Sequence, residues 1–452
     1  MNMEKVQTEF SIKKLIVIFF LIFTIFTKTY PNSWNDASRM NTIESLVERG
    51  TFIIDNSTFF NIGADKVFIN GHFYSDKPPV LSFLASGLYL ILHKFFNLSF
   101  NSSDRNSLPY YLLTLFICGL SSVLLSFFFY KSLSLLGVEE RLKYILVGSL
   151  IFGTLVFPYT TVFNNHIVAA CLLFISFYLL LKTKFCQNGF KGEIFLTSFL
   201  TSLAATIDIP SGGIFFISFL FYILADNKLR KHAYIYLSGA LIPLSLHALL
   251  NIQITGDLKP AYLHPEYFKW EGSPWLEEEF KGVISGIKFN HDLLFILKYS
   301  FHCLFGYRGL FSYSPILLFS LPMFFRAIKN NTQNLRKEIL MIFLSCFLIV
   351  SFYVTFSTTY GGMCYGMRFF IPFTPLIFFI SAIYICESSS ERLLKMFYVF
   401  LSISLIISLI GVYNPWSGGD FPLLTNLSRI LRVNREFIPI LKYIFDYIRD
   451  IV

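Results

Sequence analysis

The chain has 452 residues, a length that would ordinarily correspond to two or three soluble domains, but its composition excludes that organisation. Hydrophobic residues make up 54% of the sequence and charged residues only 14%, whereas soluble proteins carry about 25% charged residues. The net charge of +9 is not arranged in basic stretches interleaved with aromatic residues, as at a nucleic-acid surface. We therefore predict an all-α, polytopic membrane protein with no nucleic-acid partner.

Apolar runs long enough to be membrane spans recur along the whole chain, since a span needs about 20 mostly apolar residues. In order, they are 14–29, 79–96, 108–130, 144–162, 167–181, 194–208, 211–225, 233–250, 313–325, 339–356, 369–386 and 396–412. The first run follows two lysines and precedes no small-residue cleavage site. We therefore predict an uncleaved span there rather than a signal peptide.

Basic residues between these runs predict the topology. The connections richest in Lys and Arg are 131–143, 182–191, 228–231, 326–337 and 392–395, and the positive-inside rule places all of them in the cytoplasm with the N-terminus. This placement is consistent only if the run 79–96 does not cross, so we predict that it is a re-entrant or interfacial helix on the outer side. The other runs then form about eleven transmembrane helices.

This topology divides the chain into segments with different expected environments. We expect an N-terminal span in 1–29, a first extracytoplasmic loop with amphipathic helices in 30–107, a transmembrane bundle in 108–251, a second large outer loop in 252–312, C-terminal transmembrane helices in 313–412 and an extracytoplasmic tail in 413–452. The inner connections are short and hold little besides Lys and Arg. Any chemistry is therefore predicted at the outer face.

The first outer loop opens with an acid beside an amphipathic stretch. Apolar residues recur there at helical spacing, at Met40, Ile43, Leu46 and Val47. Gly50 is the expected C-terminal stop of this helix. Asp36 follows the first span closely, so partial desolvation would raise its pKa and make it a better base. The alternative is that Asp36 only caps the helix.

The segment DKPP at 76–79 is a second candidate. Its two prolines suit the first turn of a helix, and Lys77 would project near the helix N-terminus, where an anion is favoured. Asp76 with Lys77 could bind a phosphate and a metal, or the two could simply pair. Asp65 and His72 are weaker candidates of the same kind, for substrate or metal.

A third group of candidates lies late in the chain and at the ends of the spans. Glycines in TTYGGMCYGMRFFIP permit positive φ or close backbone approach, and Arg368 follows them at the mouth of a span. Arg308 has the same character, and arginine suits phosphate recognition, although both side chains could merely snorkel to the interface. Asp208 and His166, in apolar surroundings, are candidates for substrate or metal binding, but a lone His there is more often structural.

These motifs resemble those of the GT-C glycosyltransferases. NDASR, GTFIID, ADK and GHFYSDKPP in the first loop, with YGGMCYGMRFFIPFTP later, are similar to segments of the protein O-mannosyltransferase and lipid A aminoarabinose transferase group (family 39). The resemblance runs from about residue 32 to 375. Two departures stand out: Met367 replaces a usual proline, and Asn164, Asn165 and His166 stand where relatives often have a second acid, which puts any metal site in doubt.

The resemblance implies an enzyme of a bacterial cytoplasmic membrane. It would transfer a sugar, with inversion, from a polyprenyl-phosphate donor to a lipid, glycan or protein acceptor outside the membrane. Asp36 would be the general base and Lys77 would hold the donor phosphate. Arg308 and Arg368 could help to stabilise the departing phosphate. No cofactor is certain, and a divalent metal is allowed rather than required.

Two other classes of function fit parts of the sequence. A polysaccharide polymerase or ligase also has many spans, but its long catalytic loop comes late, whereas here the acid-rich loop comes first. A lipid-linked sugar flippase or other transporter would place charges at the bilayer midplane and often show internal repeats. This chain shows no repeat, and its charges are predicted at one face.

Overall fold

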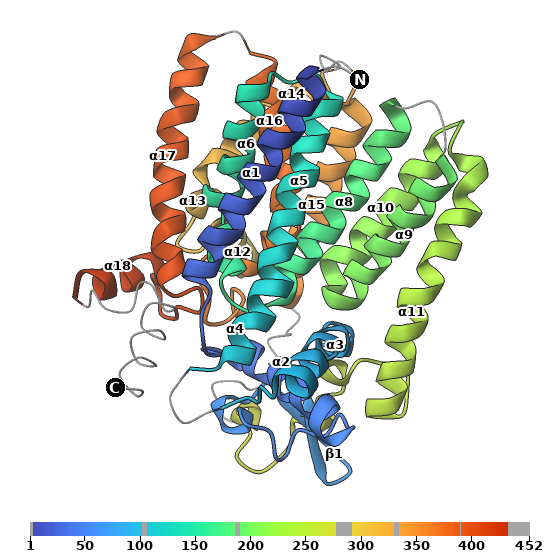
Figure 1. The fold of residues 1–452 in the computed structure, drawn as a ribbon, viewed down its shortest axis with the longest axis vertical. Coiled ribbons are helices and arrows are strands. Elements are labelled where there is room, and N and C mark those ends of the chain that lie inside the picture. The colour runs from blue at the N-terminus through green and yellow to red at the C-terminus, as the bar shows by residue number, and fades with distance from the viewer. Residues whose placement is uncertain are drawn as a thin grey trace.

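The computed structural model describes residues 3–101, 106–185, 190–276, 292–329, 334–388 and 390–432. Long helices run side by side in one bundle, and a smaller layer of short elements covers one end of it (Figure 1). The N-terminus lies at the opposite end. The described part of the chain is largely helical and has one two-stranded sheet, so the predicted all-α membrane class is confirmed.

The first half of the bundle follows the predicted runs closely. Its helices are α1 (Met3–Phe26), α4 (Leu108–Thr114), α5 (Leu120–Leu135), α6 (Glu140–Phe152), α7 (Val156–Thr160), α8 (Asn165–Phe185), α9 (Phe190–Ile207), α10 (Ile209–Ala225) and α11 (Ala233–Thr255). A π-helical turn at Leu115–Gly119 joins α4 to α5, which makes them one continuous helical rod.

The second half of the bundle repeats this correspondence. Its helices are α14 (Ser320–Ile328), α15 (Arg336–Phe356), α16 (Thr374–Cys386) and α17 (Glu391–Tyr413). Short 3₁₀ turns at Pro315–Phe319 and Arg368–Phe373 lead into α14 and α16. One continuous apolar core, with phenylalanine prominent in it, fills the bundle.

Seven helices in the described residues are long and apolar enough to cross a membrane. They span Pro79–Phe96, Leu108–Leu135, Asn165–Phe185, Arg230–Thr255, Arg336–Phe356, Arg368–Cys386 and Glu391–Tyr413, with shorter apolar helices at Ile209–Ala225, Leu293–Leu304 and Pro315–Ile328. The protein is therefore an integral membrane protein. The count of about eleven spans and their orientation stay predictions.

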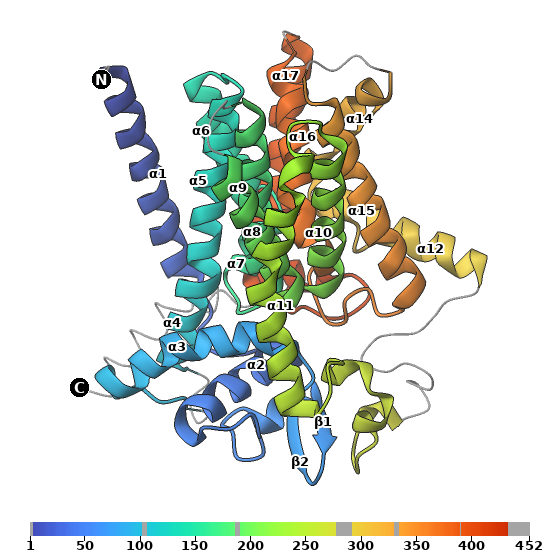
Figure 2. The ribbon, with the colours of Figure 1, turned by 90° about the vertical axis from the view of Figure 1, so that its right-hand side faces the viewer.

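The helix α3 (Pro79–Phe96) differs from the other long helices in direction. It lies crosswise under the bundle, at the end covered by the smaller layer, which comprises residues 30–101 and 256–276 and is named the outer layer after its predicted position (Figure 2). Its length and composition alone would permit a span. Its crosswise direction is what the predicted interfacial helix requires, and that assignment stays a prediction.

The outer layer is held to the bundle by a second apolar core. This core combines Met40 and Ile43 of α2 (Trp34–Glu44) with Val80 of α3, Tyr110 of α4 and Leu250 of α11. Met40 and Ile43 are both fully buried, so the amphipathic stretch predicted after the first span is confirmed. A π-helical turn extends α2 to Arg49, and Gly50 ends it in the left-handed conformation, as predicted.

A β-hairpin in the outer layer was not predicted. Strands β1 (Lys66–Ile69) and β2 (His72–Ser75) pair antiparallel around Asn70 and Gly71, which both have positive φ. An Asn-Gly pair between apolar and aromatic residues is a strong hairpin signal, so the sequence did carry the information. Val67 and Ile69 of the hairpin pack on Phe268, which joins the predicted first and second outer loops.

The remaining described elements are short. They are α12 (Leu293–Leu304), α13 (Leu310–Tyr313) and α18 (Pro422–Arg432), with isolated 3₁₀ turns between residues 60 and 276. The helix α12 is apolar and lies within the segment predicted as the second outer loop, inclined to the long axis of the bundle (Figure 2). Residues 433–452, the second half of the predicted extracytoplasmic tail, lie outside the described residues.

Candidate active site

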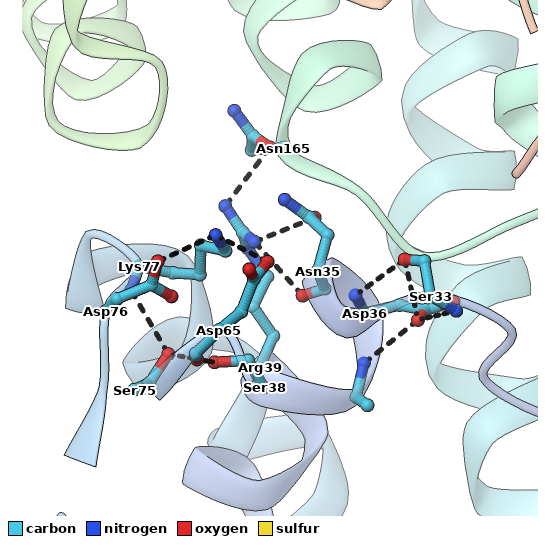
Figure 3. Close-up of polar contacts among 11 residues, drawn as sticks. Ser33, Asn35, Asp36, Ser38, Arg39, Asp65, Ser75, Asp76, Lys77 and Asn165 are labelled. Atoms are coloured by element: carbon cyan, nitrogen blue, oxygen red, sulfur yellow. Dashed lines mark hydrogen bonds and ion pairs between the residues drawn. The ribbon is translucent and has the colours of Figure 1, made fainter. Parts of the chain in front are cut away.

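Lys77 and two of the predicted acids of the first loop, Asp65 and Asp76, meet at one point (Figure 3). Lys77 Nζ lies 2.6 Å from Asp65 Oδ2 and 3.0 Å from Asp76 Oδ2. The side chains of Lys77 and Asp65 are each 14% exposed, and that of Asp76 is fully buried. Burial raises the pKa of Asp76, against the attraction of Lys77. The cluster is thus a built ion-pair network rather than a solvated surface pair.

Local structure explains why these three side chains converge. Lys77 stands between the end of β2 and Pro79, the first residue of α3, so two prolines fix its direction. The Ser38 hydroxyl of α2 contacts Ser75 Oγ at 2.6 Å and donates to the carbonyl oxygen of Asp65 at 2.5 Å. One serine on α2 therefore ties the hairpin and the preceding loop together at the cluster.

Arg39 lies beside this cluster and was not predicted as a site residue. Its guanidinium is buried and donates to Asn35 Oδ1 at 2.9 Å and to Asn165 Oδ1 at 3.1 Å. Burial lowers its pKa to about 10, while Asp76 and Asp65 raise it, so Arg39 stays protonated at neutral pH. The position of Arg39 in the sequence NDASR, close to Asp36 on the same short helix, could have indicated that Arg39 belongs to the site.

Asn165 connects Arg39 to the predicted pair His166 and Asp208. Asn165 Nδ2 donates to Asp208 Oδ2 at 3.0 Å, and His166 Nδ1 lies 2.6 Å from the same oxygen. Asp208 Oδ1 is buried and has no hydrogen-bond partner among the described residues. Asp208 and His166, at the N-terminal ends of α10 and α8, are therefore linked by hydrogen bonds to Arg39, which attracts Asp76 and Asp65 through its charge.

Asp36 occupies a different position. It is fully buried at the start of α2, and its carboxylate, on the far side of Arg39 from Lys77, forms a capping box with Ser33 (Figure 3). The amide nitrogens of Asn32, Ser33 and Ala37 and the Ser33 hydroxyl all donate to it, at 2.9–3.2 Å. Ser33 is therefore the N-cap, where the sequence suggested Asp36, and Asp36 is the third helical residue of the capping box. The role of Asp36 as a base stays a prediction.

Two further donors reach Asp36 from distant parts of the chain. Tyr110 OH and Trp416 Nε1 donate to Asp36 Oδ2 at 2.9 and 3.1 Å. Neither was predicted, because contacts across 74 and 380 residues leave no local pattern. Burial nevertheless raises the pKa of Asp36 to about 6, against the lowering effect of its hydrogen bonds.

The two predicted arginines have different surroundings. Arg308 is buried and donates to the carbonyl oxygens of Gly362 and Cys364, at 2.5 and 3.2 Å, and to that of Gly419 at 2.9 Å. It therefore holds together the two loops that follow α15 and α17. Its position as a donor-phosphate ligand stays a prediction, and in this conformation its two terminal nitrogens are occupied.

Arg368 is half-buried and forms no ion pair among the described residues. Its guanidinium lies over the rings of Trp416 and Phe369, 5.2 and 5.4 Å from their centroids. Trp416 thus connects Arg368 to Asp36. Gly361 beside it has a φ of 86°, and a Cβ there would lie 3.2 Å from Arg368 Cγ, so the predicted need for glycine is confirmed.

His72 does not join the cluster. Its ring Nδ1 lies 2.8 Å from Asp55 Oδ2 at the exposed edge of the hairpin. In the parts of the chain that the structure describes, no group of three or more His, Cys, Asp or Glu side chains is placed to hold a metal ion. Asp65 and Asp76 come together, but Lys77 stands between them and supplies the positive charge.

The arrangement of a helical bundle with a smaller layer over one end is a known fold. Two solved structures of ArnT, a lipid A aminoarabinose transferase, from Cupriavidus metallidurans share it. The TM-score is 0.57 for the apo structure and 0.54 for the structure bound to undecaprenyl phosphate, at 9% sequence identity to each. The matches cover 95% of this chain and 69% and 72% of theirs. No family model and no curated protein sequence matches the chain.

Proposed function

We propose that the protein transfers a sugar from a polyprenyl-phosphate donor to a lipid, glycan or protein acceptor, with inversion, at the outer face of the membrane. The observation that carries the proposal is the ion-pair cluster of Lys77, Asp65 and Asp76, with the buried Arg39 beside it, which lies where the outer layer meets a bundle of the ArnT fold. One of those ArnT structures is bound to undecaprenyl phosphate. Lys77 and Arg39 are the two cations of this group, and such side chains form charge-assisted hydrogen bonds with phosphate groups.

The leaving group of such a reaction is a lipid phosphate, whose negative charge grows as the bond to the sugar breaks. Cations fixed before the reaction stabilise that charge without reorganisation. Lys77 is proposed to break its ion pair with one of the two carboxylates and to pair with the phosphate instead. Arg368, which has no ion pair among the described residues, is proposed to approach the phosphate from the bundle side.

The base is proposed to be Asp36, acting on the acceptor hydroxyl. A carboxylate whose pKa is about 6 is ionised at neutral pH and is a stronger base than an exposed aspartate. Its six donors would have to be partly displaced by the acceptor. The bonds from Tyr110 and Trp416 come from side chains on other elements and are the ones proposed to yield.

The pH dependence follows from this assignment. Because the base must be deprotonated, kcat/KM is expected to rise with pH and level off above an apparent pKa of about 6. Trp416→Phe keeps a ring between Arg368 and Asp36 but removes the Nε1–H donor, which favours the ionised carboxylate. This variant should therefore move the acid limb to higher pH, whereas a purely structural Trp416 would lower the rate at every pH without moving it.

The function itself is tested by mass analysis of surface glycolipids and glycans from cells with and without the gene. Loss of one sugar from one molecule is the expected result, and it would identify both the donor sugar and the acceptor. Unchanged products would contradict the proposal and favour a transporter.

A further inference from the structure

A second candidate binding site lies between α10 and α15, which run side by side (Figure 2). It is an apolar groove of about 520 Å³, lined on α10 between Ile214 and Ala225 and on α15 between Lys337 and Leu348. Ligand sites commonly have volumes of about 300–1,000 Å³. The groove occupies the half of the bundle farthest from Lys77 and Asp36.

Polar contacts between the helices fix the walls of this groove. Ser345 donates to Ser218 across it at 2.8 Å, and Tyr222 OH donates to Glu338 Oε1 at 2.5 Å. Lys184 of α8 pairs with the same carboxylate at 2.7 Å. Glu338 is buried, so its charge is neutralised inside the protein rather than presented to the groove.

The length of the groove matches one leaflet of a bilayer. The lining spans twelve residues of each helix, Ile214–Ala225 and Lys337–Leu348, which corresponds to about 16 Å at a rise of 1.5 Å per residue. The hydrocarbon core of a bilayer is about 30 Å thick, so a groove of this length takes the chain of a lipid from one leaflet. Phe221 and Leu344, on its two walls, are 64% and 59% exposed, so it opens sideways to lipid.

Uncompensated positive charge stands at the end of the groove. Lys337 lines the groove, is exposed and makes no ion pair among the described residues. Lys228, Arg230 and Lys231 are exposed in the connection that follows α10 at the same end. Basic residues near the membrane surface attract the anionic headgroups of lipids.

We propose that the groove binds one acyl chain of an anionic phospholipid, whose headgroup phosphate pairs with Lys337. The site is distinct from the proposed donor site, which lies at the other end of the bundle. It does not depend on the proposed function, since any integral membrane protein with this groove would be exposed to such lipids.

Tryptophan fluorescence tests this proposal. The native tryptophans Trp34, Trp270 and Trp275 lie in the outer layer and Trp416 lies in the loop after α17, so Met341→Trp or Leu344→Trp would place a reporter in the groove apart from them. The protein is kept in uncharged detergent micelles and titrated with phosphatidylglycerol or phosphatidylcholine carrying brominated chains. We expect phosphatidylglycerol to quench each reporter at about tenfold lower lipid concentration.

Charge variants provide the matched controls. Lys337→Glu should abolish the preference for phosphatidylglycerol, whereas Lys395→Glu, at the same end of the bundle on α17 but outside the groove, should leave it intact. The proposal is wrong if both variants reduce the preference equally, if the two lipids quench equally in the unchanged background, or if polyprenyl phosphate displaces the brominated lipid at lower concentration than phosphatidylglycerol does.

Discussion

Replacing Asp36 by asparagine is expected to reduce sugar transfer at least about 100-fold, because a positioned base typically contributes about 10²–10⁴-fold. The amide cannot accept the proton of the acceptor. The same change also weakens the helix start, since the Asp36 carboxylate accepts the Ser33 backbone N–H at 2.9 Å. Turnover must therefore be measured per folded molecule, with thermal unfolding recorded on the same preparation.

Ser33→Ala is the matched control for this experiment. It removes the hydroxyl that accepts from Asp36 N at 3.3 Å and donates to Oδ1 at 3.0 Å, but it keeps the carboxylate. Loss of such a cap costs about 1 kcal/mol. We expect Ser33→Ala to lower the unfolding temperature while turnover stays within a few-fold of wild type. If both variants retain turnover per folded molecule, Asp36 is a structural cap and the base lies elsewhere, with Asp208 as the next candidate.

Lys77→Met is expected to abolish transfer and to destabilise the outer layer. Without Lys77, no fixed cation remains between Asp65 and Asp76. Removing one hydrogen-bond donor that stabilises a developing anion typically lowers kcat about 10²–10³-fold. Breaking a buried ion pair from one side costs about 3–5 kcal/mol. Donor turnover and thermal unfolding are measured in parallel.

A second substitution separates these two effects. Lys77→Met combined with Asp65→Asn removes one negative charge together with the positive one, which relieves the repulsion between the two acids. Thermal stability should then recover most of the loss, whereas transfer should not. Recovery of transfer together with stability would show that Lys77 is needed for pairing alone and does not bind the donor phosphate.

Several structural features of this protein could be predicted from residue types that lie close together in the sequence. Apolar runs predicted the long helices, helical spacing predicted the buried face of Met40 and Ile43, and Gly50 and Gly361 stand where a left-handed backbone is needed. Each of these features depends on residue type within a few positions. They therefore leave a signal that does not depend on the rest of the fold.

The candidate site was predictable only in part, because its contacts are long-range. Lys77 with Asp76 could be predicted from adjacency, but the partners of Arg39 and Asp36 at Asn165 and Trp416 are separated from them by 126 and 380 residues. No periodicity or turn signal reports such pairs. The position of Asp36 shows the same limit, since a capping residue and a base look alike in the sequence.

The central claim is tested most directly with purified protein in detergent, where no sealed compartment exists. The protein is incubated with a polyprenyl-phosphate sugar and an acceptor extract, and the polyprenyl species are followed by mass spectrometry. The account predicts consumption of the lipid-linked sugar and stoichiometric release of polyprenyl phosphate, both lost in Asp36→Asn. An intact donor in detergent, together with movement of the same lipid-linked sugar across the bilayer of proteoliposomes, would contradict it.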